Sequence, residues 1–519
     1  MPRRFDVIVI GSGLGGLTAG ALCAKSGLRV LVLERNDTFG GAATVYRHNG
    51  LAIETSLHEI DGLDEGDPKL PLIGALGLEQ GLQFVDVGDL YEVRGGPLEM
   101  PFVLPHGAEK ALTAAIARFP HQKAGLKEYF RRLLALRGAV SVAAQHREDR
   151  NWWLLHAPEA VRALWPLLRE GSANLGDVLS ELFGDDEAVK LALVANLVYY
   201  HDDPDRLLFL RFAIPQASYI IGGGHYVRGG SQALTDRLVA QIRDADGELD
   251  TGREANGLII ADGRVTGVRH VDRTGKDVQT DLAPIVLGNA APQVLAAMLP
   301  ETNRDIFLAP YAKHRPSISL WTVSLGLNRP ARELGVRHYS TFILPSWLKS
   351  LAQMQDSASI MAQEPGQRLP PYVFVDHSQI DSGLNQQGPH FVSYCGADRL
   401  ENWSTLSSDE RHARKTKWID ALIADVDRHF PGLAGAIVHR EMATADTMQR
   451  YLNTPGGAVY GFAPDGTLSQ TIRQGPRTPI GGLWLASAYT SGGGYTGVII
   501  GGAQAATEAI REARRARYS

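Results

Sequence analysis

The chain has 519 residues, of which 44% are hydrophobic and 21% charged, and its formal net charge is −5 at pH 7, as in a globular protein of two or three packed domains that can bury a large cofactor. It contains no basic stripe, so we expect no nucleic-acid partner. With only two cysteines, Cys23 and Cys395, it excludes a disulfide framework, a C-x-x-C redox pair and a cysteine-rich metal site.

Two segments bear on location. The first apolar strand starts at Phe5, which leaves no room before it for a signal peptide, so we expect a cytoplasmic protein. No uncharged apolar run reaches the roughly 18 residues needed to cross a bilayer. The nearest is WWLLHAPEAVRALWPLL, residues 152–168, which suits a helix lining a pocket or the core, or alternatively a peripheral contact with a membrane surface.

The N-terminal segment predicts a dinucleotide site. Residues 5–10 form an apolar, β-prone run, a helix follows over residues 14–26, and GLRVLVLE is a second strand that ends at Glu34. In the intervening turn Gly11 permits the tight bend, Gly13 lets the backbone approach a pyrophosphate, and Gly16 lets the helix pack close to the strand. The helix N-terminus offers free N–H groups to phosphate, and Glu34 can bind an adenosine ribose.

The middle of the chain carries a helix and short strands. Leucine and isoleucine recur every four residues over 231–244, where Ser231 is the expected N-cap. The runs GLIIA, RVTGVRHV and APIVLGNAAP then predict a β-meander. Residues 89–221 are mostly helical by pattern, whereas residues 293–477 mix strand-like SISLWTVSLGL with a helix around 417–429.

The C-terminal segment GLWLASAYTSGGGYTGVIIGGAQAA repeats the glycine spacing at Gly492, Gly494 and Gly497. Too few residues follow for a return strand and a ribose-binding acid, so it is not a second Rossmann unit. We expect a strand over 483–486, a glycine loop, and a helix from about Thr496 whose positive end faces whatever lies before it. A glycine-rich helix start made for close packing is the plainer alternative.

Together these motifs resemble the phytoene desaturase-like flavoproteins, the group of carotenoid desaturases, carotenoid isomerases and retinol saturases. The resemblance rests on VIVIGSGLGGLTAGALCAKSG, VLERNDTFGGAA, RGGSQALTDRLVAQI, IVLGNAAP and the closing glycine-rich segment, and GLAIETSLHEIDGL looks closest to retinol saturases. It implies an α/β fold with a Rossmann-type FAD-binding domain, of the glutathione-reductase-like and amine-oxidase type. That domain would be discontinuous, made of residues 1–88, 222–292 and 478–519, with a mixed α+β substrate domain made of 89–221 and 293–477.

The resemblance implies FAD as the cofactor. The residues expected to contact it are Gly11, Ser12, Gly13, Gly15, Gly16, Glu34, Arg35, Gly40, Gly41, Ala42, Ala255, Asn289, Ala290, Ser487, Gly494, Tyr495, Thr496 and Val498. A helix N-terminus at the flavin pyrimidine also has an independent reason, because reduced flavin is anionic near N1. Two positions depart from the pattern: many relatives have glycine at Ser487, and some have an acid at Tyr489.

Few polar residues are needed for hydride transfer between a carbon atom and a flavin, because the cofactor supplies the reactivity. Histidine titrates near neutrality, so His58, which precedes Glu59, and His225, which precedes Tyr226, are candidate catalytic residues. Tyr226 could orient a substrate, as could Tyr489 and Tyr495. Each of these residues has a purely structural alternative.

The histidine spacings show no metal-binding motif, so we expect no metal. The leading hypothesis is an FAD-dependent oxidoreductase acting on a C–C or C=C bond of an isoprenoid or polyene. The substrate would enter through residues 89–221, which carry Trp152, Trp153, Trp165, Tyr199 and Tyr200. The redox partner would be oxygen, a quinone or a nicotinamide. The alternatives are an amine-oxidase-like flavoenzyme and a non-catalytic prenyl or lipid escort protein of the same fold.

Overall fold

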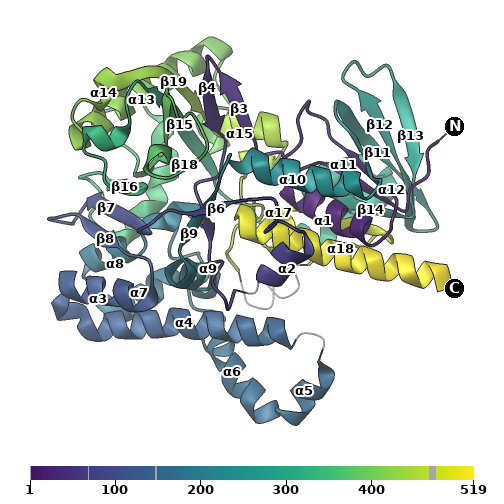
Figure 1. Cartoon of the computed structure of the whole chain (residues 1–519), viewed down its shortest axis with the longest axis horizontal. Coiled ribbons are helices and arrows are strands. Elements are labelled where there is room, and N and C mark those ends of the chain that lie inside the picture. Colours follow the sequence, from purple (N-terminus) through teal and green to yellow (C-terminus); the bar gives the residue numbers. More distant parts are fainter. Residues whose placement is uncertain (1, 68, 147–148, 367, 467–474, 519) are drawn as a thin grey trace.

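A computed structural model describes residues 2–67, 69–146, 149–366, 368–466 and 475–518. Figure 1 shows a parallel sheet with its helices beside a larger mixed sheet, and a group of helices below that larger sheet. Both chain termini lie on the side of the parallel sheet. Within the described part of the chain, no helix combines the length and apolar composition needed to cross a bilayer.

The parallel sheet has five strands in the order β10-β2-β1-β14-β20. They are β1 (Val7–Ile10), β2 (Val30–Leu33), β10 (Glu248–Asp250), β14 (Ile285–Gly288) and β20 (Leu483–Leu485). One face packs on α1 (Leu14–Lys25), α10 (Ser231–Asp244) and α18 (Gly494–Tyr518). Side chains from both faces of β1 and β2 are buried, which explains why these strands read as continuous apolar runs.

The other face of the parallel sheet packs on α11 (Pro292–Met298), α12 (Glu301–Leu308) and a three-stranded antiparallel sheet. That sheet is made of β11 (Arg253–Ala261), β12 (Arg264–Asp272) and β13 (Val278–Leu282). The predicted meander is therefore wrong in its third strand, because residues 285–288 are β14, a fully buried strand of the parallel sheet.

The larger sheet has seven strands in the order β19-β15-β18-β17-β16-β7-β8. They are β7 (Tyr91–Gly95), β8 (Phe102–Leu104), β15 (Ser319–Leu327), β16 (Ser340–Leu344), β17 (Tyr372–Asp376), β18 (His390–Asp398) and β19 (Ile437–Ala443). Its neighbouring strands are antiparallel except β16 and β7. Region 89–221 therefore begins with two strands before it becomes helical.

Helices cover both sides of the larger sheet. α13 (Ser408–His429) and α14 (Leu433–Ala436) share one apolar cluster with it. A second cluster joins it to α3 (Ala108–Arg118), α4 (Lys123–Gln145), α7 (Leu175–Phe183), α8 (Glu187–Leu193) and α9 (Phe209–Gly222). The 3-10 helix at Ala195–Tyr199 belongs to this second cluster.

Short elements connect these layers. A ribbon of β3 (Val45–His48) and β4 (Leu51–Glu54) lies near the larger sheet, and β5 (Ile60–Asp61), β9 (Gly224–Val227) and β6 (Phe84–Asp86) form a small sheet. Further short α-helices in the described ranges are α2 (Leu70–Ala75), α15 (Ala445–Leu452) and α17 (Ala488–Ser491). The division into a cofactor domain and a substrate domain stays a prediction.

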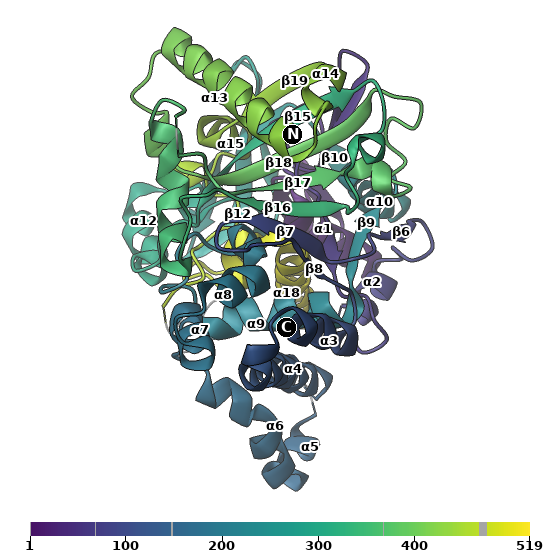
Figure 2. The same cartoon turned by 90° about the vertical axis from the view of Figure 1, so that its left-hand side faces the viewer.

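Helices α5 (Arg150–Leu155) and α6 (Ala157–Arg169) project away from the rest of the molecule (Figures 1 and 2). α6 packs against α4 and buries Ala160. Its outer face is apolar: Val161, Trp165 and Leu168 are 61%, 59% and 63% exposed. The expected position in the core or in a pocket is therefore wrong for these side chains, because α6 packs against α4 and the short α5 and neither helix covers this outer face.

Candidate dinucleotide and active site

The turn after β1 is built around Glu34. Its Oε2 accepts hydrogen bonds from the backbone N–H of Ser12 at 2.9 Å and from the Ser12 hydroxyl at 2.6 Å, and its Oε1 accepts from the N–H of Asn36 at 2.8 Å. The side chain is 5% exposed. A carboxylate oxygen has about two acceptor positions, so Oε1 retains one that can take a ribose hydroxyl.

Glycines in this turn allow backbone to approach backbone. A Cβ on Gly15 would lie 2.3 Å from the carbonyl oxygen of Ala486, and a Cβ on Gly16 would lie 2.3 Å from that of Gly11. Gly11 also has a φ of 90°, which favours glycine. A Cβ on Gly502 would lie 2.3 Å from the oxygen of Gly15, so α1 and α18 cross at glycines.

A second glycine loop lies against the first. Gly13 and Gly40 form an isolated parallel bridge, and a Cβ on Gly41 would come within 3.2 Å of the Cα of Gly13. Gly13 is the N-cap of α1, and no described side chain caps that end. The first N–H groups of a helix have no partner inside the helix, so this double loop presents backbone donors.

The start of α18 is joined to the N-terminal loops. The hydroxyls of Tyr495 and Ser56 are 2.8 Å apart, and Ser56 donates to the carbonyl oxygen of Ala42 at 2.7 Å. Thr496 donates to Asp61 Oδ1 at 2.6 Å. A Cβ on the exposed Gly494 would meet no described atom within 4 Å, so the first residue of this helix is uncrowded. α18 begins at Gly494, two residues before the predicted start, and the short α17 precedes it.

The neighbouring strands β14 and β20 bring together Asn289, Ala290 and Ser487, which were predicted to contact the cofactor. The Asn289 side chain donates to the carbonyl oxygen of Ala486 at 2.5 Å, and the Ser487 hydroxyl donates to that of Ala290 at 3.2 Å. Elsewhere in the site, the backbone N–H of Arg253 donates to the carbonyl oxygen of Glu34 at 2.8 Å, two residues before the buried Ala255.

Two predicted cofactor residues have other contacts. The Arg35 guanidinium donates to the carbonyl oxygens of Arg450 and Tyr451, both at 2.8 Å, at the C-terminal end of α15. This leaves the backbone of Arg35, rather than its charge, beside the dinucleotide loops. Val498 lies half-buried in α18, packed against the cluster that covers the parallel sheet.

Glu54 is a buried acid that sequence reasoning missed. It accepts from the N–H of Ser231 at 2.8 Å, from the Ser231 hydroxyl at 2.6 Å and from the Tyr226 hydroxyl at 3.2 Å. Ser231 is therefore not the N-cap of α10, a position that Gly230 occupies, because its hydroxyl is used by Glu54. Burial raises the pKa of Glu54, and these hydrogen bonds oppose that rise.

His58 lies inside the molecule beside tyrosines. Its Nδ1 is 2.9 Å from the Tyr199 hydroxyl, and its carbonyl oxygen accepts from the Tyr339 hydroxyl at 2.6 Å. Burial lowers the pKa of His58 to about 4, so the ring is neutral at pH 7. His58 can accept or donate a hydrogen bond there, but it carries no charge.

Glu59 lies next to His58 and is strongly perturbed. Its Oε1 accepts from the Tyr219 hydroxyl at 2.7 Å, whereas its buried Oε2 has no hydrogen-bond partner among the described residues. A Cβ on Gly224 would lie 2.1 Å from Oε2. Burial raises the pKa of Glu59 to about 8, so this carboxyl is mostly protonated at pH 7 and can donate a proton.

The structure does not bring the two predicted histidines into one pair. His225 and Tyr226 are successive residues of β9, so their side chains point to opposite faces. The titratable groups that act electrostatically on His225 are Asp86, His106, Lys69 and Asp61. Burial is the largest cause of its lowered pKa, and its Nδ1 has no hydrogen-bond partner within the described chain. Tyr226 donates to Glu54 and so supports that acid.

The aromatic residues expected to line a substrate path divide into two groups. Tyr199 and Tyr200 belong to the apolar cluster around His58, whereas Trp152 and Trp153 lie on α5 and Trp165 on α6, in the projecting hairpin. Tyr489 lies on the short α17, where its ring packs on Phe462 and its buried hydroxyl has no hydrogen-bond partner in the described ranges.

The comparisons with known proteins agree with this geometry. A model described as an NAD(P)-binding Rossmann-like domain matches residues 9–69. The chain is 26% identical to human all-trans-retinol 13,14-reductase, over 96% of this chain and 85% of that one. It is 23% identical to the chloroplastic prolycopene isomerase of Daucus carota, over 90% of this chain and 73% of that one. Over most of its length the chain is therefore similar to the phytoene desaturase-like flavoprotein oxidoreductases.

Solved structures support the fold of this phytoene desaturase-like protein. Cyclohexylamine oxidase from Brevibacterium oxydans matches with a TM-score of 0.62 at 17% identity, covering 99% of this chain and all of that one. An oxidoreductase from Methanosarcina mazei matches with a TM-score of 0.61 at 16% identity, covering 96% of this chain and 99% of that one. The expected α/β fold of the amine-oxidase type is therefore confirmed.

Proposed function

We propose that this flavoprotein oxidoreductase binds FAD across the double glycine loop and the start of α18, and acts on a C–C or C=C bond of an apolar polyene or isoprenoid. The residues suit an extended dinucleotide. Gly13 and Gly41 allow the backbone to approach a pyrophosphate, Glu34 keeps an acceptor position for a ribose, and Gly494 leaves the first residue of α18 uncrowded.

One observation supports the reaction type. His58 and Glu59 are buried, and their neighbours Leu57 and Ile60 belong to the apolar cluster that joins the larger sheet to its helices. FAD, when bound, would supply the hydride acceptor or donor. The neutral ring of His58 and the protonated carboxyl of Glu59 would orient the substrate and move a proton, while Tyr199 and Tyr219 hold them by hydrogen bonds. The names of two relatives, a retinol reductase and a prolycopene isomerase, support a polyene substrate.

The substrate would be taken up from a lipid surface. Val161, Trp165 and Leu168 form an exposed apolar face on the projecting α6, and tryptophan favours the boundary between lipid and water. We therefore assign a peripheral membrane contact to the α5–α6 hairpin. This contact would let an apolar substrate reach the enzyme without crossing water.

The test has two stages. The absorbance spectrum of the purified protein should show bound FAD, and a colourless protein that binds only NAD would contradict the proposal. Oxidised and prereduced enzyme should then be mixed anaerobically with polyenes, terpenoids and amines. We expect polyenes or terpenoids either to reduce the oxidised flavin, if they are desaturated, or to reoxidise the reduced flavin, if they are saturated. A response to amines alone would support an amine oxidase, and lipid binding without any flavin would support an escort protein. Oxygen, quinones and nicotinamides are then added separately to the anaerobic enzyme and compared as redox partners.

A further inference from the structure

A cluster of side chains outside the dinucleotide site joins β3 to β19, the edge strand of the larger sheet. His48 comes from β3, and His439 and Glu441 come from β19. Alternate residues of a strand point to the same face, so the H-x-E spacing of His439 and Glu441 puts both side chains on one side. Residue spacing does not predict a metal here, because His48 is distant from the other two residues along the chain.

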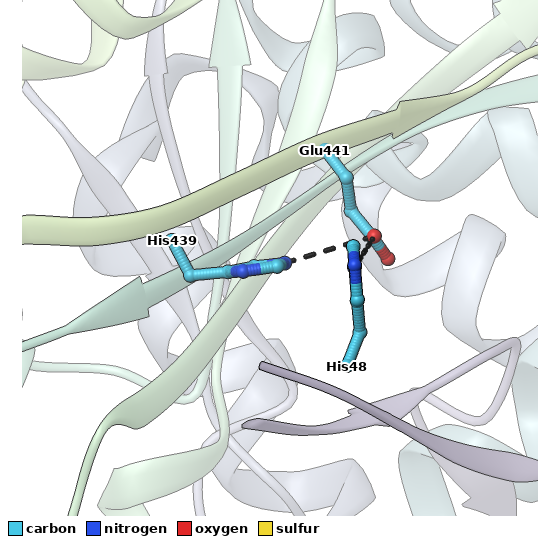
Figure 3. Close-up of side chains that lie close together, drawn as sticks. All are labelled: His48, His439 and Glu441. Atoms are coloured by element: carbon cyan, nitrogen blue, oxygen red, sulfur yellow. Dashed lines mark hydrogen bonds and ion pairs between the residues drawn. The ribbon is translucent and has the colours of Figure 1, made fainter. Parts of the chain in front are cut away.

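The three side chains converge on one point, as Figure 3 shows. Glu441 Oε2 lies 2.9 Å from His48 Nδ1 and 3.6 Å from His439 Nε2. All three ligand atoms lie within 4.8 Å of one another. A tetrahedral Zn²⁺ with bonds of about 2.0–2.1 Å holds neighbouring ligand atoms roughly 3.3 Å apart, so only small side-chain shifts are needed.

His439 gives an independent reason to expect a ligand. Its side chain is 8% exposed, and its buried Nε2 has no hydrogen-bond partner among the residues described. A buried polar atom without a partner costs free energy, and a ring nitrogen aimed at a carboxylate is a ready metal ligand. The His48 side chain, in contrast, is 53% exposed, which leaves room for water on the ion.

Neighbouring side chains hold the Glu441 carboxylate in a position where it can bind a metal ion. The Tyr46 hydroxyl donates to Glu441 Oε1, which turns Oε2 toward the two imidazoles. Ligating carboxylates in metal sites are commonly held by such a hydrogen bond. Arg440, between the two β19 ligands, points to the other face and pairs with Asp420, so its positive charge is directed away from the cluster.

We propose that His48, His439 and Glu441 bind a divalent transition-metal ion of the Zn²⁺ type, with water in the fourth position. Two imidazoles and one carboxylate suit such an ion, whereas Mg²⁺ and Ca²⁺ prefer oxygen ligands alone. The ion connects the β3–β4 ribbon to the larger sheet. That ribbon lies between Gly40 and Glu54, so metal binding stabilises the arrangement of segments that flank the dinucleotide loops.

The test is a titration of the purified chain with Zn²⁺ against a chromogenic chelator. We expect one tight ion per chain, a loss of affinity of at least tenfold in His48→Ala, and a similar loss in Glu441→Gln. His121→Ala is the matched control, because His121 also pairs with a carboxylate, Asp186 at 2.6 Å, and is similarly exposed. Equal affinity in wild type and His48→Ala would overturn the proposal, as would a loss in His121→Ala of the same size.

A second measurement separates this site from weak surface binding. Substitution by Co²⁺ should give the visible absorption of a tetrahedral site in the wild type and not in His48→Ala. Zinc should also raise the midpoint of thermal unfolding in the wild type, because an ion that binds only the folded state stabilises it. An equal shift in His48→Ala would assign the ion to another place and contradict the proposal. Since His48 is exposed, its replacement should leave the fold intact.

Discussion

His58 Nδ1 lies 2.9 Å from the hydroxyl of Tyr199, which links the segment after β4 to the 3-10 helix that ends at Tyr199. The rings meet edge to face, with centroids 5.8 Å apart. Because burial holds the pKa of His58 near 4, this is a hydrogen bond between two neutral groups at pH 7. The pair can therefore orient an apolar substrate without placing a charge inside the apolar cluster.

The first prediction concerns the two histidines. Replacing His58 with Phe should lower the single-turnover rate about 10²-fold while FAD stays bound, a typical loss for a group that handles a proton. Replacing His225 with Phe should leave the rate nearly unchanged. The groups that act on His225 are the polar side chains of Asp86, His106 and Lys69, not the apolar cluster in which the substrate would lie. Stopped-flow absorbance of the flavin, normalised to FAD content, measures both. The reverse order of effects would assign the proton to His225.

The second prediction uses the pKa of Glu59, which burial raises to about 8. A carboxyl that stays protonated in the folded state but ionises in the unfolded chain stabilises the protein at low pH. The free energy of unfolding should thus fall as pH rises from about 4.5 to 8, with a slope of up to about 1.4 kcal/mol per unit.

Denaturant unfolding at several pH values tests this slope. Glu59→Gln cannot ionise, so its stability should change less over this interval than that of the wild type. Glu79→Gln removes an exposed carboxyl and should retain the wild-type slope. Identical pH profiles for the wild type and Glu59→Gln would contradict a buried, neutral Glu59.

The third prediction tests the double glycine loop. A Cβ on Gly13 would lie 2.5 Å from Asn289 Oδ1, and a larger side chain would also fill the space that the pyrophosphate needs. Gly13→Val should therefore abolish FAD binding. Gly138→Ala is the control, because this glycine is in α4 and an added Cβ meets nothing within 4 Å. The control should keep its FAD, gain up to about 1 kcal/mol of stability, and retain the flavin absorbance that Gly13→Val loses.

Sequence patterns predicted the parts of the fold that are determined by residues close together in the chain. The turn from Gly11 to Gly16 and the strand before Glu34 follow from glycine spacing and an apolar run. Strands β7, β8 and β13 were missed because short strands depend on pairing with distant segments. α13 begins at Ser408, before the helix predicted around 417–429. Its start does have a local signal, the capping box of Ser407 and Glu410, which the prediction did not use.

The residues of the candidate site also fall into those that sequence spacing predicts and those that only folding brings together. The dinucleotide loops are contiguous motifs, so their residues could be proposed from spacing. Glu54 is different, because its partners Ser231 and Tyr226 lie far along the chain and only folding brings them together. The cluster of His48, His439 and Glu441 is also formed by distant segments, and no spacing rule predicts it. The perturbation of Glu59 depends on burial, which the sequence does not state.

The last prediction concerns the apolar face of α6. Leu168 is 63% exposed on the projecting hairpin, and Ile306 is 59% exposed on α12. If α6 lies in a membrane surface, Leu168→Ser should weaken binding to phosphatidylcholine vesicles about tenfold or more, because each fully buried aliphatic side chain contributes roughly 1.5–3 kcal/mol. Ile306→Ser should bind like the wild type. Neither change should alter stability much, since both side chains already face water.

Sedimentation with vesicles measures binding. The turnover of a vesicle-bound polyene should fall with Leu168→Ser, while the turnover of a detergent-solubilised polyene should stay constant. Equal vesicle binding by the two variants would remove α6 from the membrane contact.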